Sequence, residues 1–211
     1  MPSLLSDCGI CTFLKKMKSK KWNALLSQVK IVSSEWPVEN DSSLVTCSLE
    51  DFLEFKNKTR FPFPEDFGLF CQTFGSGRFG KKWILILAFP GFDNIDAHIA
   101  GHREILEAFK ESFEHLPKTV SILEKSYPFA SYDQILFVFT KEEGSSEKCM
   151  INAVNDDDGK VYDMGEDFFL FVRDYCLSTK IKRDFPELLS AIFSDSEMFE
   201  QVVLRIFTPL R

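Results

Sequence analysis

Short apolar runs separated by polar loops dominate the pattern between residues 126 and 176. Three of them follow one another, at residues 135–140, 149–154 and 160–163. The first is rich in β-branched and aromatic side chains, which is typical of a strand buried on both faces. The last two are joined by Asn155, three aspartates and Gly159, which favour a hairpin turn. The pattern therefore predicts an antiparallel meander.

A helix is predicted directly after this meander, because Gly165 breaks the strand pattern and Asp167 can cap a helix. Its apolar positions recur at three- and four-residue spacing: Phe168, Phe171, Val172, Tyr175 and Cys176. The same spacing predicts a helix capped by Ser48, one that begins near Pro64, and one over residues 93–116 that is interrupted at Gly101. It also predicts two C-terminal helices, around residues 188–193 and 199–207. A further buried strand is predicted at residues 83–89.

Together these elements predict an α+β fold with a mainly antiparallel sheet and helices packed against it. With 211 residues, we expect one domain with terminal extensions. The domain is placed at residues 46–178. Residues 1–45 form a partly helical N-terminal extension, and residues 179–211 form a C-terminal helical extension packed on the domain.

Charge, hydropathy and cysteine content indicate the kind of partner and the cellular compartment. The formal net charge of −7 argues against a nucleic-acid partner, which needs a basic surface, and suits a basic protein partner better. The alternative is that this charge only maintains solubility. No segment approaches the ~20 apolar residues of a membrane span. Six scattered cysteines and the absence of a signal-peptide pattern favour a cytoplasmic protein with reduced, buried thiols.

Three stretches that look like chemical motifs fail in their details. Residues 75–82 match glycine-rich phosphate loops, but a helix enters and a strand leaves, whereas phosphate binding needs the reverse order. Cys8 and Cys11 have redox-motif spacing, yet no strand precedes them. The loop at residues 155–159 lacks the ligands of a calcium loop. We therefore predict no cofactor and no catalytic residue.

His98 and His102 are the remaining candidates, because histidines four residues apart on a helix are suited to zinc. The glutamate expected after the first histidine is absent, and Ile99 occupies its place. The alternative interpretation is two exposed or partly satisfied histidines. We predict no metal site and no enzyme. A metal-dependent enzyme that uses this pair is the third hypothesis.

Three blocks of residues, in this order and spacing, resemble the SUKH superfamily. The first is Phe63-Pro64-Glu65-Asp66-Phe67 with the helix and glycines that follow, and the second is Tyr127-Pro128-Phe129-Ala130. The third joins Asp156, Gly159, Val161 and Asp163 to the Phe168–Val172 segment. The resemblance covers roughly residues 49–177. This superfamily contains bacterial immunity proteins and fungal cell-wall regulators of the Smi/Knr type.

The resemblance implies an immunity protein that binds and neutralises a cognate toxin domain, often a nuclease. A regulatory or scaffold module of the Smi/Knr type is the alternative, and we expect a monomer or homodimer. Clustered carboxylates can complement a basic nuclease cleft and accelerate encounter. The contact residues we predict are therefore those of two acidic loops, although solvated hairpin tips would carry the same residues: Glu142, Glu143, Asp156, Asp157 and Asp158.

Overall fold

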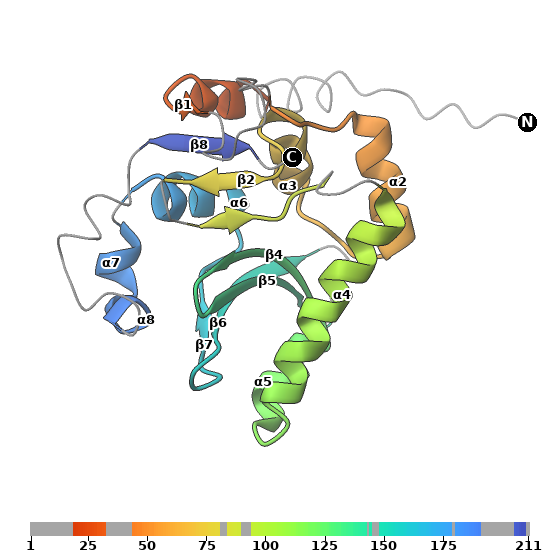
Figure 1. Cartoon of the computed structure of the whole chain (residues 1–211), viewed down its shortest axis with the longest axis vertical. Coiled ribbons are helices and arrows are strands. Elements are labelled where there is room, and N and C mark those ends of the chain that lie inside the picture. Colours follow the sequence, from red (N-terminus) through yellow and green to blue (C-terminus); the bar gives the residue numbers. More distant parts are fainter. Residues whose placement is uncertain are drawn as a thin grey trace, which may run out of the picture.

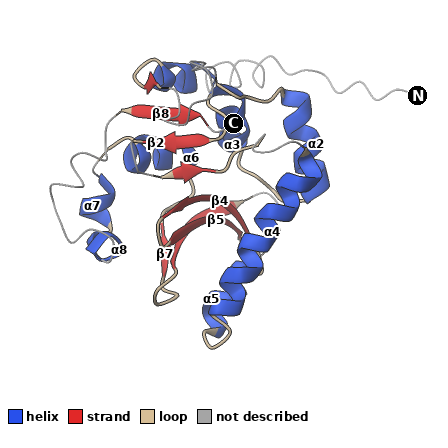
Figure 2. Ribbon diagram, in the orientation of Figure 1, coloured by secondary structure: helices blue, strands red, loops and turns tan. Residues whose placement is uncertain are grey.

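The computed structural model of the chain describes residues 19–32, 44–80, 84–89, 94–142, 144, 148–178, 180–190 and 205–209. Helices lie around a twisted sheet that runs through the molecule (Figures 1 and 2). The described residues form eight strands in the order β1-β8-β2-β3-β4-β5-β6-β7, and all neighbours except β1 and β8 are antiparallel. The predicted α+β fold class is confirmed.

The predicted meander forms the C-terminal half of this sheet. It consists of β5 (Ile135–Lys141), β6 (Cys149–Asn155) and β7 (Val161–Asp163). Strand β5 pairs with β6 over its whole length, from Ile135 opposite Asn155 to Lys141 opposite Cys149. Because β5 lies inside the sheet and both of its faces are covered, all its residues up to Thr140 are buried.

Strand β4 (Ser126–Tyr132) was not predicted. Its sequence contains Pro128, which argues against an inner strand because proline cannot donate a ladder hydrogen bond. In the structure the register shifts between Pro128 and Ala130, and the residues of β4 that lie opposite β3 are Ala130 and Ser131. The proline therefore lies beyond the paired part of β3, where its missing N–H breaks no ladder bond.

The N-terminal half of the sheet is made of short strands: β1 (Lys30–Ile31), β2 (Gly77–Phe79), β3 (Leu85–Ile86) and β8 (Ile206–Pro209). The strand predicted at residues 83–89 shrinks to β3, and residue 83 lies outside the described residues. The helix predicted around residues 199–207 is wrong at its end, because Ile206 and Phe207 belong to β8, and residues 199–204 lie outside the described residues. The sheet thus crosses both expected domain boundaries, with β1 before residue 46 and β8 after residue 178.

The packing of Phe207 accounts for the strand at residues 206–209. The Phe207 ring lies 4.9 Å from Phe79 and 5.3 Å from Phe74, inside the main core. Gly77 leaves the space that the ring occupies, since a Cβ there would overlap it. Strand pairing on both sides, with β1 and β2, satisfies the backbone of β8. Such partners are invisible to a local helical pattern.

The helices that precede β4 begin largely at the predicted signals. Helix α2 (Leu49–Thr59) is capped by Ser48, whose side chain accepts from Asp51 N while the Asp51 carboxylate accepts from Ser48 N. Helix α3 (Glu65–Thr73) follows Pro64. Helix α4 (Ile95–Ser112) passes through Gly101, so the predicted interruption there is wrong, and Pro117 opens the separate helix α5 (Pro117–Leu123).

The remaining helices follow the meander. Asp167 caps α6 (Phe168–Phe171) through Leu170 N, and the chain continues as the π-helical turn η1 (Val172–Cys176). Two short helices, α7 (Lys180–Asp184) and α8 (Pro186–Ser190), form the described helical part of the C-terminal extension. The buried Ile181 and Leu188 pack this part onto the main core.

Two hydrophobic clusters cover the two faces of the meander. Phe137 and Phe139 face the larger cluster, which contains the buried aromatic rings of α2, α3 and α6 and the buried Trp22. Leu136 and Val138 face the smaller cluster, to which α5 and the end of α4 contribute. Figure 1 shows α4 and α5 running diagonally past the β4–β7 meander. The meander is therefore the middle layer between two groups of helices.

Candidate functional site

The two acidic loops predicted as contact surfaces lie at opposite ends of β6. Glu142 is exposed next to the start of β6, whereas Asp156, Asp157 and Asp158 are exposed directly after its last residue. Seven residues of extended chain span about 20 Å, so the structure does not bring the two loops together. Glu143 lies outside the described residues. The aspartate loop is the better defined of the two, and it is the candidate site.

The aspartate loop is held by hydrogen bonds within the loop and to two neighbouring elements. Within the loop, Asp157 N donates to Asn155 Oδ1 at 3.0 Å, and Gly159 N donates to Asn155 O at 2.9 Å. Thr119 of α5 donates its hydroxyl to Gly159 O at 2.8 Å, and Asp156 N donates to Gln134 O at 2.7 Å. The loop is therefore fixed against both the helix layer and the β4–β5 turn.

The Gln134 contact adds a fourth carboxylate that the sequence analysis missed. Asp133 occupies the β4–β5 turn with a φ of 46° and is exposed, one residue before Gln134. Two apolar strands separated by Asp-Gln are a turn signal that could have found it. We call Asp133, Asp156, Asp157 and Asp158 the acidic hairpin end.

No cation of the described residues pairs with the acidic hairpin end. Within the described part of the chain, no Lys, Arg or His nitrogen lies within 4 Å of these carboxylates, whereas Asp66, Asp174 and Glu187 each pair with a lysine. Among the described residues, one backbone N–H donates to a carboxylate of this group, from Lys160 N to Asp158 Oδ1 at 2.9 Å. Lys160 turns its Nζ toward Glu187 and lies 4.9 Å from the centroid of Tyr162. Three of the four carboxylates are thus available to an external cation.

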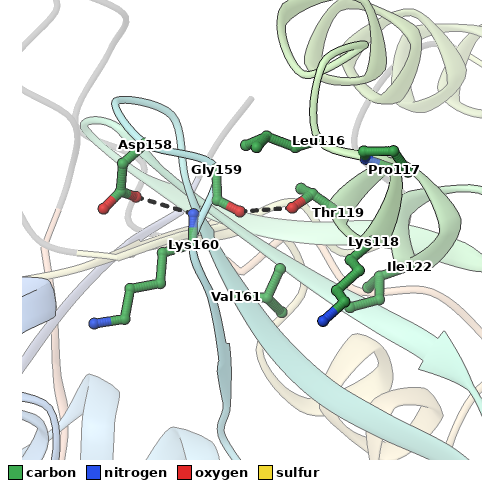
Figure 3. A pocket seen from close by; sticks show the side chains of 9 residues that line it. All are labelled: Leu116, Pro117, Lys118, Thr119, Ile122, Asp158, Gly159, Lys160 and Val161. Carbon is green, nitrogen blue, oxygen red and sulfur yellow. Dashed lines mark hydrogen bonds between the residues drawn. The ribbon is translucent and has the colours of Figure 1, made fainter.

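An open groove of about 680 Å³ adjoins the acidic hairpin end (Figure 3). Its apolar wall comes from Leu116, Pro117 and Ile122 on the helix side and from Val161 on β7. Figure 3 shows Asp158 and Lys160 on the hairpin side, with the amine of Lys160 directed away from α5. Lys118 lines the helix side. We call this groove the hairpin groove. Its apolar wall lies between charged residues, Asp158 and Lys160 on the hairpin side and Lys118 on the helix side.

Gly159 is required where the loop meets the helices. Its φ is +66°, and a Cβ there would lie 2.5 Å from Leu116 Cδ1 and 2.8 Å from Phe113 Cδ1. We expect Gly159→Ala to lower the free energy of unfolding by about 2 kcal/mol, through backbone strain and crowding of these side chains. Urea denaturation measures the loss. Gly144→Ala is the control, because Gly144 also has a positive φ but open space around it. Equal losses for the two variants would contradict the crowding argument.

His98 and His102 are not exposed, which corrects that part of the expectation, and they stack within the core. Their ring centroids are 4.2 Å apart, and the His102 ring lies 5.0 Å from that of Tyr127. His102 Nδ1 lies 2.7 Å from Pro128 O, while His102 Nε2 and the Tyr127 hydroxyl have no hydrogen-bond partner among the described residues. Burial lowers the pKa of His98 to about 4 and that of His102 to about 3. Both rings are therefore neutral at pH 7.

Metal and nucleophilic chemistry find little support among the described residues. No group of three His, Cys, Asp or Glu side chains there is arranged to hold a metal ion. Cys47, Cys71, Cys149 and Cys176 are buried and free, as predicted. Burial raises the pKa of the Cys149 thiol to about 11 and raises the pKa values of the Cys71 and Cys176 thiols well above their usual range, so these thiols stay protonated. Cys8 and Cys11 lie outside the described residues.

The glycine-rich stretch after α3 is a helix-to-strand turn, as predicted. Gly75 has a φ of +71°, and a Cβ there would overlap Val45 O. Ser76 is fully buried and donates its hydroxyl to Ala88 O. The described part of the turn is therefore filled by the protein's own backbone.

None of the helices in the described part of the chain is both long and apolar enough to cross a bilayer.

Comparison with known proteins adds no relative to this picture. No family model matches the chain, and no curated protein and no solved structure is significantly similar to it.

Proposed function

We propose that this chain is a non-enzymatic binding protein whose acidic hairpin end contacts a basic protein domain. The observation that supports this function is the combination of a fixed backbone with carboxylates that no described cation neutralises. A rigid anionic surface accelerates encounter with a basic partner and loses little conformational entropy on binding. Among the other described carboxylates, Asp66, Asp174 and Glu187 each pair with a lysine.

The resemblance to the SUKH superfamily makes an immunity protein the leading form of this function. Its partner would be a toxin domain with a cationic cleft, such as a nuclease, which needs positive charge to hold phosphate. The acidic hairpin end would cover that cleft in place of nucleic acid. Protection then results from binding alone, without turnover.

A regulatory or scaffold module is the second candidate, and one observation favours it. Helix α2 exposes Leu49 and Leu53, which are 51% and 47% accessible and lie one helical turn apart. An exposed apolar pair on one helix face is suited to a protein partner without strong positive charge. Such a partner would bind independently of the acidic hairpin end.

Co-expression with a toxin domain encoded beside this chain's gene tests the immunity function. We expect protected cells and a complex that survives purification. The variant D156K/D157K tests the contact surface most directly, because it leaves Asp158, whose carboxylate accepts from Lys160 N, in place. We expect it to slow association with the basic domain at least tenfold at low salt, by replacing attraction with repulsion. Stopped-flow measurements across a salt series give the rate and its salt dependence.

Two controls separate this surface from net charge and from the other acidic loop. E50K/E124K changes the net charge by the same amount, at exposed glutamates outside the acidic hairpin end. E142K tests the loop at the far end of β6. We expect both to leave the association rate within about twofold, after screening by salt. Equal effects of D156K/D157K and E50K/E124K would reject the acidic hairpin end as the contact surface, and absence of both protection and complex would reject immunity.

A further inference from the structure

Strand β7 forms one edge of the sheet, beside the acidic hairpin end and the hairpin groove. It is the last strand in the order of described strands, and its only strand partner there is β6. Lys160 O accepts from Asn155 N at 3.0 Å, and Met164 N donates to Ile151 O at 2.8 Å. In an antiparallel ladder, these pairs alternate with residues whose backbone groups point outward. Val161 and Asp163 therefore direct their N–H and C=O groups away from β6.

The side chains of β7 point to two faces of the sheet, one packed against the main core and one beside the hairpin groove. Tyr162 faces the main core, where its ring centroid lies 6.3 Å from that of Phe185. Val161 faces the opposite side, where it packs on the smaller cluster and lines the hairpin groove. Figure 3 shows Val161 directed into the space between the hairpin and α5. A strand added beside β7 would place every second side chain on the side of that groove.

We propose that the edge of β7 and the hairpin groove together bind an extended peptide segment in which apolar and basic residues alternate. The segment pairs its backbone with Val161 and Asp163, adding a strand to the sheet. One apolar side chain enters the hairpin groove between Ile122 and Val161. The inference deepens the proposed function, on which it rests, by specifying the form in which a basic partner is recognised.

Charge complementarity selects a basic segment. Exposed carboxylates mark both ends of the strand, Asp158 before it and Asp163 at its last residue, with Glu166 and Asp167 exposed just beyond. The lysine closest in sequence, Lys160, is held by Glu187. A peptide strand that runs along β7 would pair with its three residues and pass between these carboxylates. Lysines or arginines at the ends of the segment, beyond the paired residues, would reach the carboxylates, while the apolar side chain beside Val161 fills the groove.

The direct test uses a capped eight-residue peptide in which lysine and valine alternate, titrated into the full chain by fluorescence anisotropy. A second peptide of equal charge carries proline in place of a central valine, so that it lacks one backbone donor. We expect the first peptide to bind and the second to bind at least tenfold more weakly. No binding of the first peptide, or equal binding of both, would overturn the inference.

Two protein variants locate the binding site. Val161→Pro removes an outward N–H without removing a bond to β6, and Ile122→Lys places a charge in the groove. We expect each to weaken binding of the Lys–Val peptide at least tenfold. Ser121→Lys adds the same charge at an exposed neighbour that does not line the groove, and should change affinity less than twofold. Thermal unfolding confirms that the variants are folded.

The same variants distinguish this inference from the proposed function. If D156K/D157K weakens the complex with the basic domain but Val161→Pro and Ile122→Lys do not, the acidic surface stands and strand addition is rejected. If the two edge variants weaken the complex and the charge reversal does not, the acidic surface is rejected and strand addition stands.

Discussion

Lowering the pH from 7 to 5 is expected to reduce the free energy of unfolding by about 4 kcal/mol, because His98 and His102 are buried as neutral rings. Their pKa values fall from 6.5 to about 4 and about 3 in the folded protein, mainly through burial. Below pH 6.5 the unfolded chain takes up protons that the folded chain does not. Stability is therefore fully present above pH 6.5 and is lost progressively until the pH reaches about 3.

Aromatic side chains of the described residues surround the two rings. Aromatic rings of Phe55 and Phe89 lie 5.3 and 5.6 Å from His98, and Tyr127 stacks on His102. The nearest carboxylate on the same helix in sequence, Asp96, is exposed and pairs with Lys58. Burial raises the pKa of the Tyr127 hydroxyl, which stays neutral throughout this range. The cluster therefore resists protonation.

Urea denaturation at several pH values measures the expected slope. About two protons should be taken up on unfolding near pH 5, one for each histidine. His98→Phe suits the aromatic surroundings and removes one titrating group, so it should roughly halve the slope between pH 6.5 and pH 5. A wild-type stability that is flat over this interval would contradict the neutral burial of the pair.

Phe168→Ala is expected to cost about 3–5 kcal/mol of stability, because the ring joins several elements at one point. It is 1% exposed, and its centroid lies 5.3 to 5.6 Å from those of Phe67, Phe70, Phe129 and Phe139. These neighbours belong to α3, β4 and β5. Removing the ring leaves a cavity between layers that short helices cannot easily close.

Leu170→Ala provides the matched control two residues further along. Leu170 is 40% exposed on the same helix, so its truncation should change stability by less than about 1 kcal/mol. Thermal and urea unfolding of both variants give the difference. Comparable losses of stability in the two variants would contradict the role of the Phe168 ring in packing the sheet against the helices.

Local pattern was enough to predict the centre of this fold. The apolar run of β5, the Asx-rich turn before Gly159 and the capping residues Ser48 and Asp167 each act within a few residues of chain. Strand preference, positive φ and capping are local properties, so the sequence alone carries them. The fold class, the meander and the helices around it followed from these signals.

Local pattern failed where the decisive partner is distant in the chain. Strand β8 owes its form to β1 and β2, and β4 accommodates Pro128 only because β3 ends before it. The helical spacing of residues 199–207 could not reveal these partners. Short strands gain their stability from neighbours rather than from their own few residues.

The candidate site shows the same division between sequence and tertiary structure. The sequence by itself determined that residues 156–158 form an acidic turn, since the turn chemistry is local. Only the tertiary structure brought Asp133 to the turn and buried His98 and His102. Position relative to other strands depends on sheet register, and burial depends on what packs above a residue. Neither quantity is encoded in the spacing of residues along a single segment.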